Sequence, residues 1–200
     1  MFAKGRYTAM ELLEKRILKD GIVLPGDVLK VNSFLNHQID VKFISELGKE
    51  FYRLYSDCGV NKILTIESSG IGIACLTAQF FDSPVVFAKK SKTSNIASGV
   101  WSAAAHSFTH GNDYTAIVSK EYLGKGDRVL IIDDFLANGA ALNALVSICE
   151  SAGAEVVGCG AVIEKTYQGG GNMLRKRGVR VESLAKISSM SDDGKITFCR

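Results

Sequence analysis

The chain has 200 residues, of which 46% are hydrophobic and 22% are charged, and its formal net charge is +3. A chain of this length and composition can bury a complete core, so we expect one globular domain over residues 1–200. The positive charge is mild, and no stripe of Lys and Arg with interleaved aromatic residues is present. We therefore expect no nucleic acid partner, although an anionic small molecule would suit this charge.

The apolar stretches end well before the about 20 residues that a membrane span requires, and the amphipathic N-terminus is unlike a signal peptide. The five cysteines, which form no C-x-x-C pair, are Cys58, Cys75, Cys149, Cys159 and Cys199. This pattern is typical of reduced thiols in a core. We expect no membrane partner and a cytoplasmic location.

Hydrophobic periodicity alternates between helical and strand spacing along the first half of the chain. The predicted elements are a helix over 9–20 that stops at Gly21, an extended mixed segment over 27–40, a helix over 41–57, a strand over 62–67 and a helix over 70–81. We expect residues 21–40, together with the C-terminal segment, to form a small hood beside the main sheet.

The alternation continues in the second half of the chain. The predicted elements are strands over 84–90 and 128–133, a helix over 140–152, a strand over 155–164 and two short strands within 180–200. The strands are continuously apolar instead of alternating, which indicates an α/β fold with a parallel sheet flanked by helices on both faces. Ligand sites in such sheets lie at the carboxyl ends of the strands.

The segment over 91–112 is rich in Ser, Thr, Ala, Gly and His and has weak periodicity. It is predicted to be a mobile loop. Loops of this length within compact domains are often lids or binding loops, and a poorly ordered surface loop is the alternative.

The stretch "VLIIDDFLANGAAL" ends a buried strand in two acids, Asp133 and Asp134. The following run of small residues, Ala137, Asn138, Gly139, Ala140 and Ala141, places backbone N–H groups at a helix N-terminus, where an anion can approach unhindered. Both carboxylates are expected to face the ligand and could hold a ribose diol or a hydrated Mg²⁺. The alternative is a capped helix, but capping needs only one acid.

Other nucleotide-binding motifs match less well. No Gly-Lys-Ser/Thr of a Walker loop follows a strand. In "SGIGIAC", Cys75 stands where the dinucleotide fingerprint requires Gly or Ala.

A hydrophobic strand, two acids, two apolar residues and a small-residue loop resemble the phosphoribosyl-pyrophosphate motif of type I phosphoribosyltransferases. "DVLKVNSFLNHQID", "TIESSGI", "PVVFAKK" and "VIEKTYQGG" narrow the resemblance to the bacterial xanthine phosphoribosyltransferases. The matches keep the family's order from Gly21 to the end of the chain. The segment of about twenty residues before Gly21 is longer than the family leads us to expect. The loop "ANGAA" lacks the acid and threonine of hypoxanthine-guanine relatives.

The resemblance implies roles for the residues that would bind the sugar diphosphate. Residues 137–141 would hold the 5-phosphate, and Asp133 with Asp134 would hold the ribose hydroxyls directly or through Mg²⁺. The pyrophosphate loop would consist of Glu67, Ser68, Ser69 and Gly70. Lys89 and Lys90 could neutralise the pyrophosphate. A serine N-cap and a solvated lysine pair are the structural alternatives.

For the base, the resemblance implies contacts from Leu29, Asn36, Phe135 and Lys165. An ammonium at the end of a buried strand requires an acceptor, which a purine 6-oxo group would provide. The alternative for Lys165 is a salt bridge with Glu164 or another acid. The alternative for Phe135 is a place in the core.

The implied activity is transfer of the phosphoribosyl group from phosphoribosyl pyrophosphate to N9 of xanthine, with Mg²⁺ as cofactor and a homodimer as the expected assembly. Lys165 would be the catalytic lysine beside Asp133 and Asp134. The alternatives are the same chemistry on guanine, hypoxanthine or adenine, or a purine-responsive regulator that binds DNA. Lys165 argues against adenine, and a single predicted helix before the hood argues against a helix-turn-helix.

Overall fold

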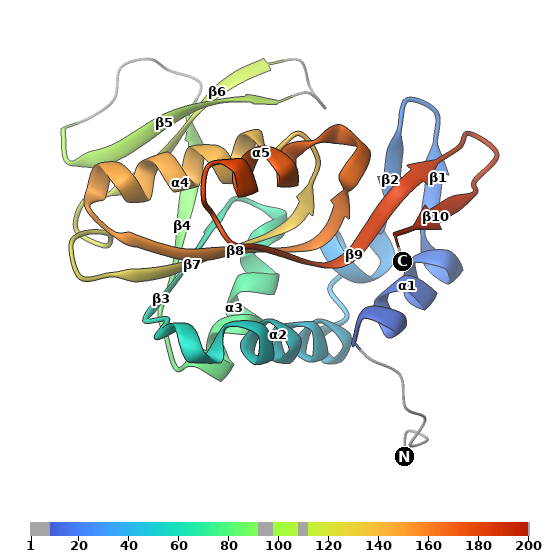
Figure 1. Ribbon diagram of the computed structural model, residues 1–200, viewed down its shortest axis with the longest axis horizontal. Coiled ribbons are helices and arrows are strands. Elements are labelled where there is room, and N and C mark those ends of the chain that lie inside the picture. The colour runs from blue at the N-terminus through green and yellow to red at the C-terminus, as the bar shows by residue number, and fades with distance from the viewer. Residues whose placement is uncertain (1–8, 92–97, 108–111, 200) are drawn as a thin grey trace.

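The computed structural model describes residues 9–91, 98–107 and 112–199. Its centre is an eight-stranded sheet with the order β10-β9-β8-β7-β3-β4-β6-β5 (Figure 1). The strands are β3 (Lys62–Ile66), β4 (Val85–Ser91), β5 (Val100–Ser107), β6 (Asn112–Ser119), β7 (Arg128–Leu136), β8 (Glu155–Lys165), β9 (Val181–Met190) and β10 (Ile196–Phe198).

The sheet is mixed, with a parallel central part. Strands β4, β3, β7, β8 and β9 run parallel, whereas β10, β6 and β5 join the two edges in antiparallel pairs. The continuously apolar runs are the central strands: four of the five residues of β3 are buried, as is most of β7. The prediction of a parallel sheet is confirmed for this part. The strands are continuously apolar because a strand covered by helices on both faces has no polar face.

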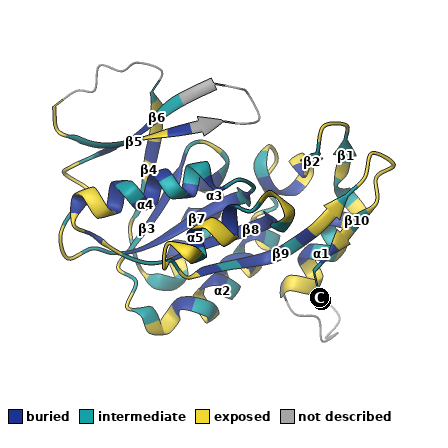
Figure 2. Cartoon of the chain, turned by 45° about the horizontal axis from the view of Figure 1, so that its top comes forward, coloured by how far each residue is buried: buried dark blue, intermediate teal, exposed yellow. Residues whose placement is uncertain are grey.

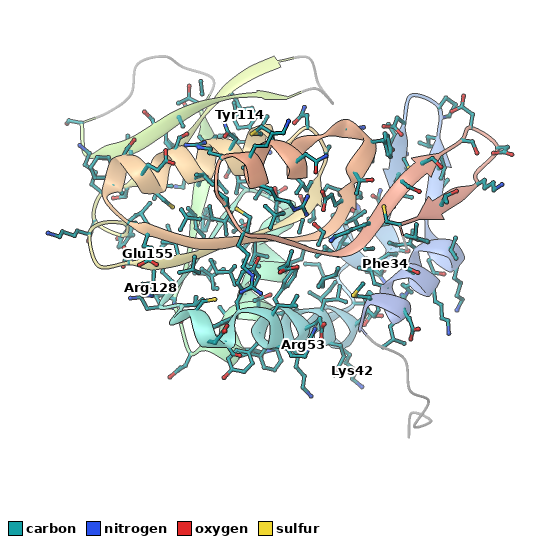
Figure 3. The ribbon with its side chains drawn as sticks, in the orientation of Figure 1. Phe34, Lys42, Arg53, Tyr114, Arg128 and Glu155 are labelled. Atoms are coloured by element: carbon teal, nitrogen blue, oxygen red, sulfur yellow. The ribbon has the colours of Figure 1, made fainter. Side chains whose placement is uncertain are left out.

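Helices cover both faces of the sheet. In Figure 1, α2 (Val41–Tyr55) and α3 (Ser69–Phe81) lie below it, and α4 (Ala140–Ala152) and α5 (Gly170–Lys176) lie on the opposite face. Each face has its own hydrophobic cluster, one under α2 and α3 and one under α4. Figure 2 shows the buried residues following the central strands between these helices. Outside, charged side chains such as Arg53 extend from α2 away from the sheet (Figure 3). Within the described residues, no helix is long and apolar enough to span a membrane.

The N-terminal segment packs beside β9. It contains α1 (Ala9–Asp20), the antiparallel hairpin of β1 (Ile22–Leu24) and β2 (Val28–Lys30), and a π-helical turn over Asn32–Asn36. The predicted extended segment over 27–40 was wrong in its second half. The π-helical turn buries the adjacent side chains Phe34 and Leu35 together, whereas a strand would turn them to opposite faces.

The region over 91–112 was predicted to be a loop, yet most of its described part is strand β5, which pairs with β6. The prediction was wrong here because small residues hid the periodicity. Ala105, Ala116 and Val118 lie in the cluster under α4, so small side chains let the hairpin pack closely on that helix. Residues 92–97 and 108–111 lie outside the described residues, as do the side chains of His106 and His110.

The strand order reverses at β3. The chain leaves β3 through α3 to β4 on one side, while β7 lies on the other side of β3. A crevice outside the carboxyl ends of β3 and β7 is therefore the expected ligand position in this topology.

Candidate active site

Strand β7 continues through the two acids to Leu136, three residues beyond the predicted end at Asp133. Successive side chains of a strand point to opposite faces, so the two carboxylates are directed apart. Asp133 is 5% exposed and Asp134 is 8% exposed. The expectation that both acids face the ligand was wrong for Asp133: of these two acids, Asp134 lines the pocket and Asp133 does not.

The Asp133 carboxylate points towards the start of α3. A Cβ built on Gly70 would lie 3.1 Å from Asp133 Oδ1 and 2.2 Å from Thr65 Oγ1, so only glycine fits at position 70. Thr65 is fully buried, and its hydroxyl has no hydrogen-bond partner among the described residues. Burial and the neighbouring Asp134 raise the pKa of Asp133 well above its usual value, while Lys90 acts in the opposite direction.

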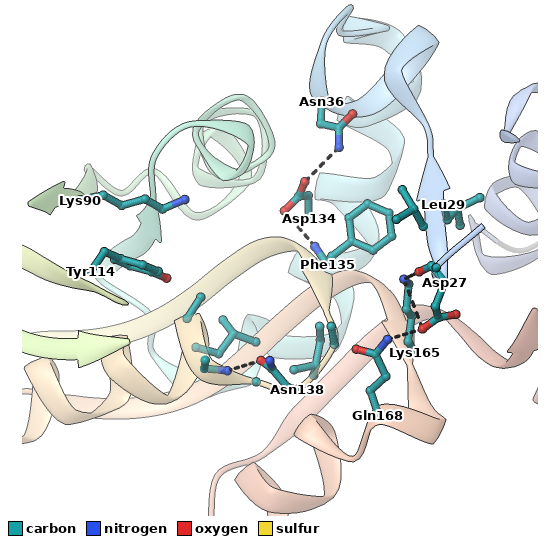
Figure 4. Close-up of a pocket in the computed structure, with 18 residues that line it drawn as sticks. Asp27, Leu29, Asn36, Lys90, Tyr114, Asp134, Phe135, Asn138, Lys165 and Gln168 are labelled. Carbon is teal, nitrogen blue, oxygen red and sulfur yellow. Dashed lines mark hydrogen bonds and ion pairs between the residues drawn. The ribbon is translucent and has the colours of Figure 1, made fainter. Parts of the chain in front are cut away.

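Asp134 connects β7 to the N-terminal segment. Asn36 Nδ2 donates a 3.3 Å hydrogen bond to Asp134 Oδ2, and the backbone N–H of Phe135 donates a 2.9 Å bond to Oδ1. Phe135 packs against the core cluster and also lines the pocket, so the predicted alternative of a place in the core is present, while its contact with the base stays a prediction. Leu29, which is 6% exposed, lies opposite it in Figure 4.

The small-residue loop leads into α4. Gly139 precedes the helix with a φ of 83°, a left-handed conformation that favours glycine. The Asn138 side chain accepts a 2.9 Å hydrogen bond from the backbone N–H of Ala140. The first residue of α5 supports this loop: the N–H of Gly170 donates to the carbonyl of Ala137 at 3.0 Å, and a Cβ on Gly170 would lie 2.4 Å from the nitrogen of Gly139.

These elements enclose a pocket of about 530 Å³ (Figure 4). The predicted residues that line it are Leu29, Asn36, Lys90, Asp134, Phe135, Ala137, Asn138, Gly139, Ala140, Ala141 and Lys165. The structure therefore brings together the predicted base, ribose and phosphate residues. Among the described residues, Asp133, Ser68, Ser69 and Gly70 lie outside this lining.

Lys165, at the end of β8, is 8% exposed. Its ammonium donates a hydrogen bond to the backbone carbonyl of Asp27, and Nζ lies 3.8 Å from Asp27 Oδ2. Burial lowers the pKa of Lys165, whereas the Asp27 carboxylate acts in the opposite direction. The predicted alternative of a salt bridge with another acid is thus present, and the acid is Asp27.

Glu164 has different partners. Arg175 donates to both of its carboxylate oxygens at 3.1 Å, and Ser183 Oγ donates at 2.6 Å. These bonds lower the pKa of Glu164 despite its burial. The fork of Arg175 therefore fixes Glu164 under α5 and leaves Lys165 to the pocket.

The residues after β3 lie beside the end of β4. The backbone N–H of Lys90 donates a 2.7 Å hydrogen bond to Glu67 Oε1, which joins the predicted pyrophosphate loop to β4. The peptide bond between Glu67 and Ser68 is cis. The Lys90 ammonium lies 5.4 Å from the centre of the Tyr114 ring. Lys90 thus lies at the end of the pocket opposite Lys165 (Figure 4).

Seven lining residues were not identified from the sequence, and three of these carry polar side chains: Asp27, Tyr114 and Gln168. Tyr114 lies on β6, a strand that the periodicity did not reveal. Asp27 has a φ of 64°, and its position after Gly26 in "LPGD" was the available signal of a turn. Gln168 follows Lys165 by three residues, and one helical turn is enough to return it to the same site.

The residues present fit a magnesium ion that is held mainly by substrate. The described residues contain no group of three or more His, Cys, Asp or Glu side chains that could bind a metal ion alone. Mg²⁺ is usually bound through one or two carboxylates together with substrate phosphates and water. Asp134, beside a loop suited to phosphate, matches that description.

Comparison with known proteins identifies the class. Residues 32–185 match the phosphoribosyl transferase domain family. This match covers more than half of the chain and contains the β7 acids and the α4 loop, so the chain belongs to the phosphoribosyltransferase family.

Curated relatives are more specific. A protein of Lachnoclostridium phytofermentans named xanthine phosphoribosyltransferase is 56% identical over 190 residues, 94% of this chain and 98% of the relative. A Clostridium novyi protein of the same name is 54% identical and covers 94% of this chain and 99% of its own. Both of these relatives are named xanthine phosphoribosyltransferase.

Solved structures support the fold. Adenine phosphoribosyltransferase of Rhodothermus marinus is 26% identical, with a TM-score of 0.69 and coverage of 90% of this chain and 98% of that one. The Trypanosoma brucei enzyme, solved with AMP, pyrophosphate and ribose-5-phosphate, has a TM-score of 0.75 at 20% identity, covering 91% and 82%. The latter likeness concerns the fold alone.

Proposed function

We propose that this protein transfers the 5-phosphoribosyl group of phosphoribosyl pyrophosphate to N9 of xanthine, giving xanthosine monophosphate and pyrophosphate. One observation carries the proposal: a single pocket joins the glycine-capped start of α4 to a buried lysine, in a chain 56% identical to a xanthine phosphoribosyltransferase. The first end suits a phosphate and the second suits an oxopurine.

At the sugar end, the backbone N–H groups of residues 137–141 bind the 5-phosphate, because the small side chains leave them accessible. Asp134 accepts hydrogen bonds from the ribose hydroxyls. Lys90, which reaches the pocket beside Tyr114, compensates the charge of the pyrophosphate. Residues 67–70 are held beside Lys90 by the hydrogen bond from the Lys90 backbone N–H to Glu67 Oε1, and their hydroxyl and backbone donors would serve the same anion.

At the base end, Phe135 and Leu29 supply apolar walls for the purine faces. Asn36 adds an amide whose Oδ1 is buried without a hydrogen-bond partner among the described residues. Lys165 donates to the 6-oxo group of the base. Burial disfavours its charged form, so an oxygen acceptor stabilises it.

In the reaction the bond between C1′ and the pyrophosphate oxygen breaks, with the electron pair leaving on pyrophosphate. The bond between C1′ and N9 forms, and the imidazole ring of the base releases one proton. The positive charge that develops on the ribose requires positioned reactants and a compensated leaving group. The pocket provides both by fixing base and phosphate at opposite ends.

The residues also support Mg²⁺ as the cofactor. When bound with the sugar diphosphate, the ion would neutralise phosphate charge and polarise the leaving group. Asp134 would hold the ion directly or through the ribose and water. Asp133 would act on it from the opposite face of β7.

The first test is turnover of phosphoribosyl pyrophosphate with xanthine, guanine, hypoxanthine and adenine, measured as kcat/KM with Mg²⁺. We expect xanthine to be the best substrate and adenine the poorest, because adenine places a donor opposite the Lys165 donor. A higher kcat/KM for adenine would contradict the assignment.

The second test removes both acids with Asp133→Asn and Asp134→Asn. The expected result is loss of turnover in a folded protein, with Asp192→Asn in the turn before β10 as the control for an exposed acid. Near-normal turnover of the double variant would contradict the proposal.

A non-catalytic, purine-responsive DNA-binding regulator is the competing function. The described residues before β1 contain only α1, which packs into the core through Leu13 and Ile17. We expect no specific DNA binding in a titration with random duplexes at physiological salt.

The remaining assignments are a cytoplasmic location and a homodimer. Reduced cysteines support the location, since the described cysteines include no disulfide. The dimer follows from the family resemblance, and its mass in solution by light scattering is the direct measurement.

A further inference from the structure

Asp27 lies where the N-terminal hairpin meets the base end of the pocket. It occupies the turn between β1 and β2 in a left-handed conformation with a φ of 64°. This conformation directs both its carbonyl and its carboxylate to Lys165, more than 130 positions later in the chain. Figure 4 shows the two residues together beside Phe135 and Leu29.

The short helix that follows β8 supplies two more contacts. Gln168 Nε2 donates to Asp27 Oδ2, and the Tyr167 hydroxyl donates to Oδ1. Oδ2 is also the oxygen that lies 3.8 Å from Lys165 Nζ. One carboxylate oxygen is therefore flanked by an ammonium donor and an amide donor, while Tyr167 holds the other oxygen.

Purine bases differ in the hydrogen-bonding groups that they would present to Lys165, Asp27 and Gln168. Xanthine presents an acceptor at the 6-oxo group, a donor at N1–H and a second acceptor at the 2-oxo group. Guanine has a 2-amino donor in place of the last acceptor, and hypoxanthine has only a C–H there. Adenine reverses the first two positions.

We propose that Lys165, Asp27 and Gln168 form a donor, acceptor and donor row that recognises the 6-oxo, N1–H and 2-oxo edge of xanthine. Gln168 is then the residue that distinguishes xanthine from hypoxanthine and guanine, and Asp27 selects a lactam N–H. This inference rests on the proposed function, since it names the base selectivity of the same pocket.

The exposure of these groups supports the proposal. All three residues line the pocket, and the side chain of Asp27 is 35% exposed, so its carboxylate is accessible to a ligand. An ionised carboxylate accepts about four hydrogen bonds, so its bonds to Tyr167 and Gln168 leave capacity for N1–H. The amide of Gln168 keeps its second N–H for the 2-oxo group.

The Asp27 carbonyl now accepts the hydrogen bond from Lys165. A bound base replaces it with its 6-oxo group, so the ammonium exchanges one acceptor for another and stays compensated in a buried position. Tyr167 remains on Oδ1 throughout and keeps the carboxylate in place.

The test compares kcat/KM ratios between bases in one protein, so that changes in expression or general activity cancel. In Gln168→Met the donor is lost at similar side-chain volume. We expect the ratio of kcat/KM for xanthine to kcat/KM for hypoxanthine to fall by about tenfold, which is the effect of losing one hydrogen bond of about 1.4 kcal/mol. Turnover of hypoxanthine should be retained.

Two further variants sharpen the test. Gln168→Glu replaces the donor with an acceptor, so the ratio of kcat/KM for guanine to kcat/KM for xanthine is expected to rise. Asp27→Asn keeps a residue type that tolerates a positive φ. It is expected to lower kcat/KM for xanthine, guanine and hypoxanthine by similar factors, because all three bases carry N1–H. Gln79→Glu is the matched control, since this amide lies on α3 and donates to Ser45, outside the pocket lining.

Unchanged ratios in Gln168→Met would overturn the proposal, and so would a larger loss of kcat/KM for hypoxanthine than for xanthine, because hypoxanthine has no 2-oxo group. A wild-type protein that converts xanthine while its Gln168 variants keep wild-type ratios refutes this inference alone. A wild-type protein that converts no purine refutes the proposed function as well.

Discussion

Asn36 Nδ2 donates a 3.3 Å hydrogen bond to Asp134 Oδ2, which connects the N-terminal π-helical turn to β7 across 98 positions of sequence. Asn36 Oδ1 has no hydrogen-bond partner among the described residues and is buried. A buried acceptor without a partner is costly. Asn36 is therefore a polar group that a ligand can satisfy.

Asn36→Leu keeps the size of this side chain and removes both polar atoms. We expect the KM for xanthine to rise by about tenfold, as for the loss of about one hydrogen bond, because a base contact is lost. Asn32→Ala, in the same turn but exposed, is the control and should leave both substrates unaffected. An equal change in the two variants would place the effect in the fold of the turn.

The pH dependence of stability should report the environment of Asp133. Burial and Asp134 hold the pKa of Asp133 well above its usual value, so above the unfolded pKa of about 3.9 the folded state binds more protons here. Stability from this site is complete below that unfolded pKa and is lost as pH rises through the folded pKa.

Asp133→Asn removes this titration. We expect the variant to have a higher Tm than the wild type at about pH 8 and a weaker fall of Tm with rising pH, without Mg²⁺ and substrate. Thermal unfolding across this range is the measurement. Parallel curves for the two proteins would show that Asp133 titrates normally.

Lys165→Gln should weaken oxopurines selectively. A hydrogen bond from a charged group contributes about 1.5–3 kcal/mol, which corresponds to an increase in the KM for xanthine of about 10- to 150-fold. The KM for phosphoribosyl pyrophosphate is expected to change little. Lys42→Gln, on the exposed side of α2 (Figure 3), is the control; equal losses for adenine and xanthine would place Lys165 outside base recognition.

Two glycines in backbone contact predict a selective effect on the sugar diphosphate. A side chain at Gly139 would be strained at its positive φ and would lie 3.1 Å from Gly170 Cα, while one at Gly170 would lie 2.4 Å from the Ala137 carbonyl. Gly139→Val and Gly170→Ala should both raise the KM for phosphoribosyl pyrophosphate. Gly194→Ala, at another positive φ with open space around it, controls for backbone strain alone; a change in Tm without a change in KM would indicate a purely structural loop.

The resemblance places Ala137 where hypoxanthine-guanine relatives would carry an acid. The side chains of residues 137–141 themselves supply no base for the purine proton. Because xanthine is more acidic than hypoxanthine, we expect kcat/KM for xanthine to rise as pH passes through the ionisation of the free base. Ala137→Asp should assist hypoxanthine more than xanthine. The pH profiles of both bases, with both proteins, are the measurement; a flat xanthine profile would assign proton removal to water or another group.

The sequence predicted the elements whose pattern comes from burial. The apolar runs of β3, β7 and β8 and the amphipathic α2 could be predicted because they face a core. The apolar run of β7 also located Asp133 and Asp134, although the strand continues beyond them to Leu136. Strand β5 could not, because Ala and Ser side chains alternate too little in polarity to show which face is buried.

The candidate site was predicted where chemistry is local in sequence, as in residues 133–141. Asp27 and Gln168 could not be predicted, since their relation depends on how a hairpin tip meets the end of β8 in space. The burial of Asp133 was missed for a related reason: its environment is formed by Gly70 and Thr65, from another strand and helix.

The first residue of α5 is bonded to the loop before α4 through the main chain, from the N–H of Gly170 to the carbonyl of Ala137. The spacing between the two ends of the pocket is thus set by main chain. Side chains that read the base can change without moving the anchor for the sugar. Evolution or protein engineering can therefore change which base is accepted by substituting a few side chains while the main-chain spacing of the pocket stays the same.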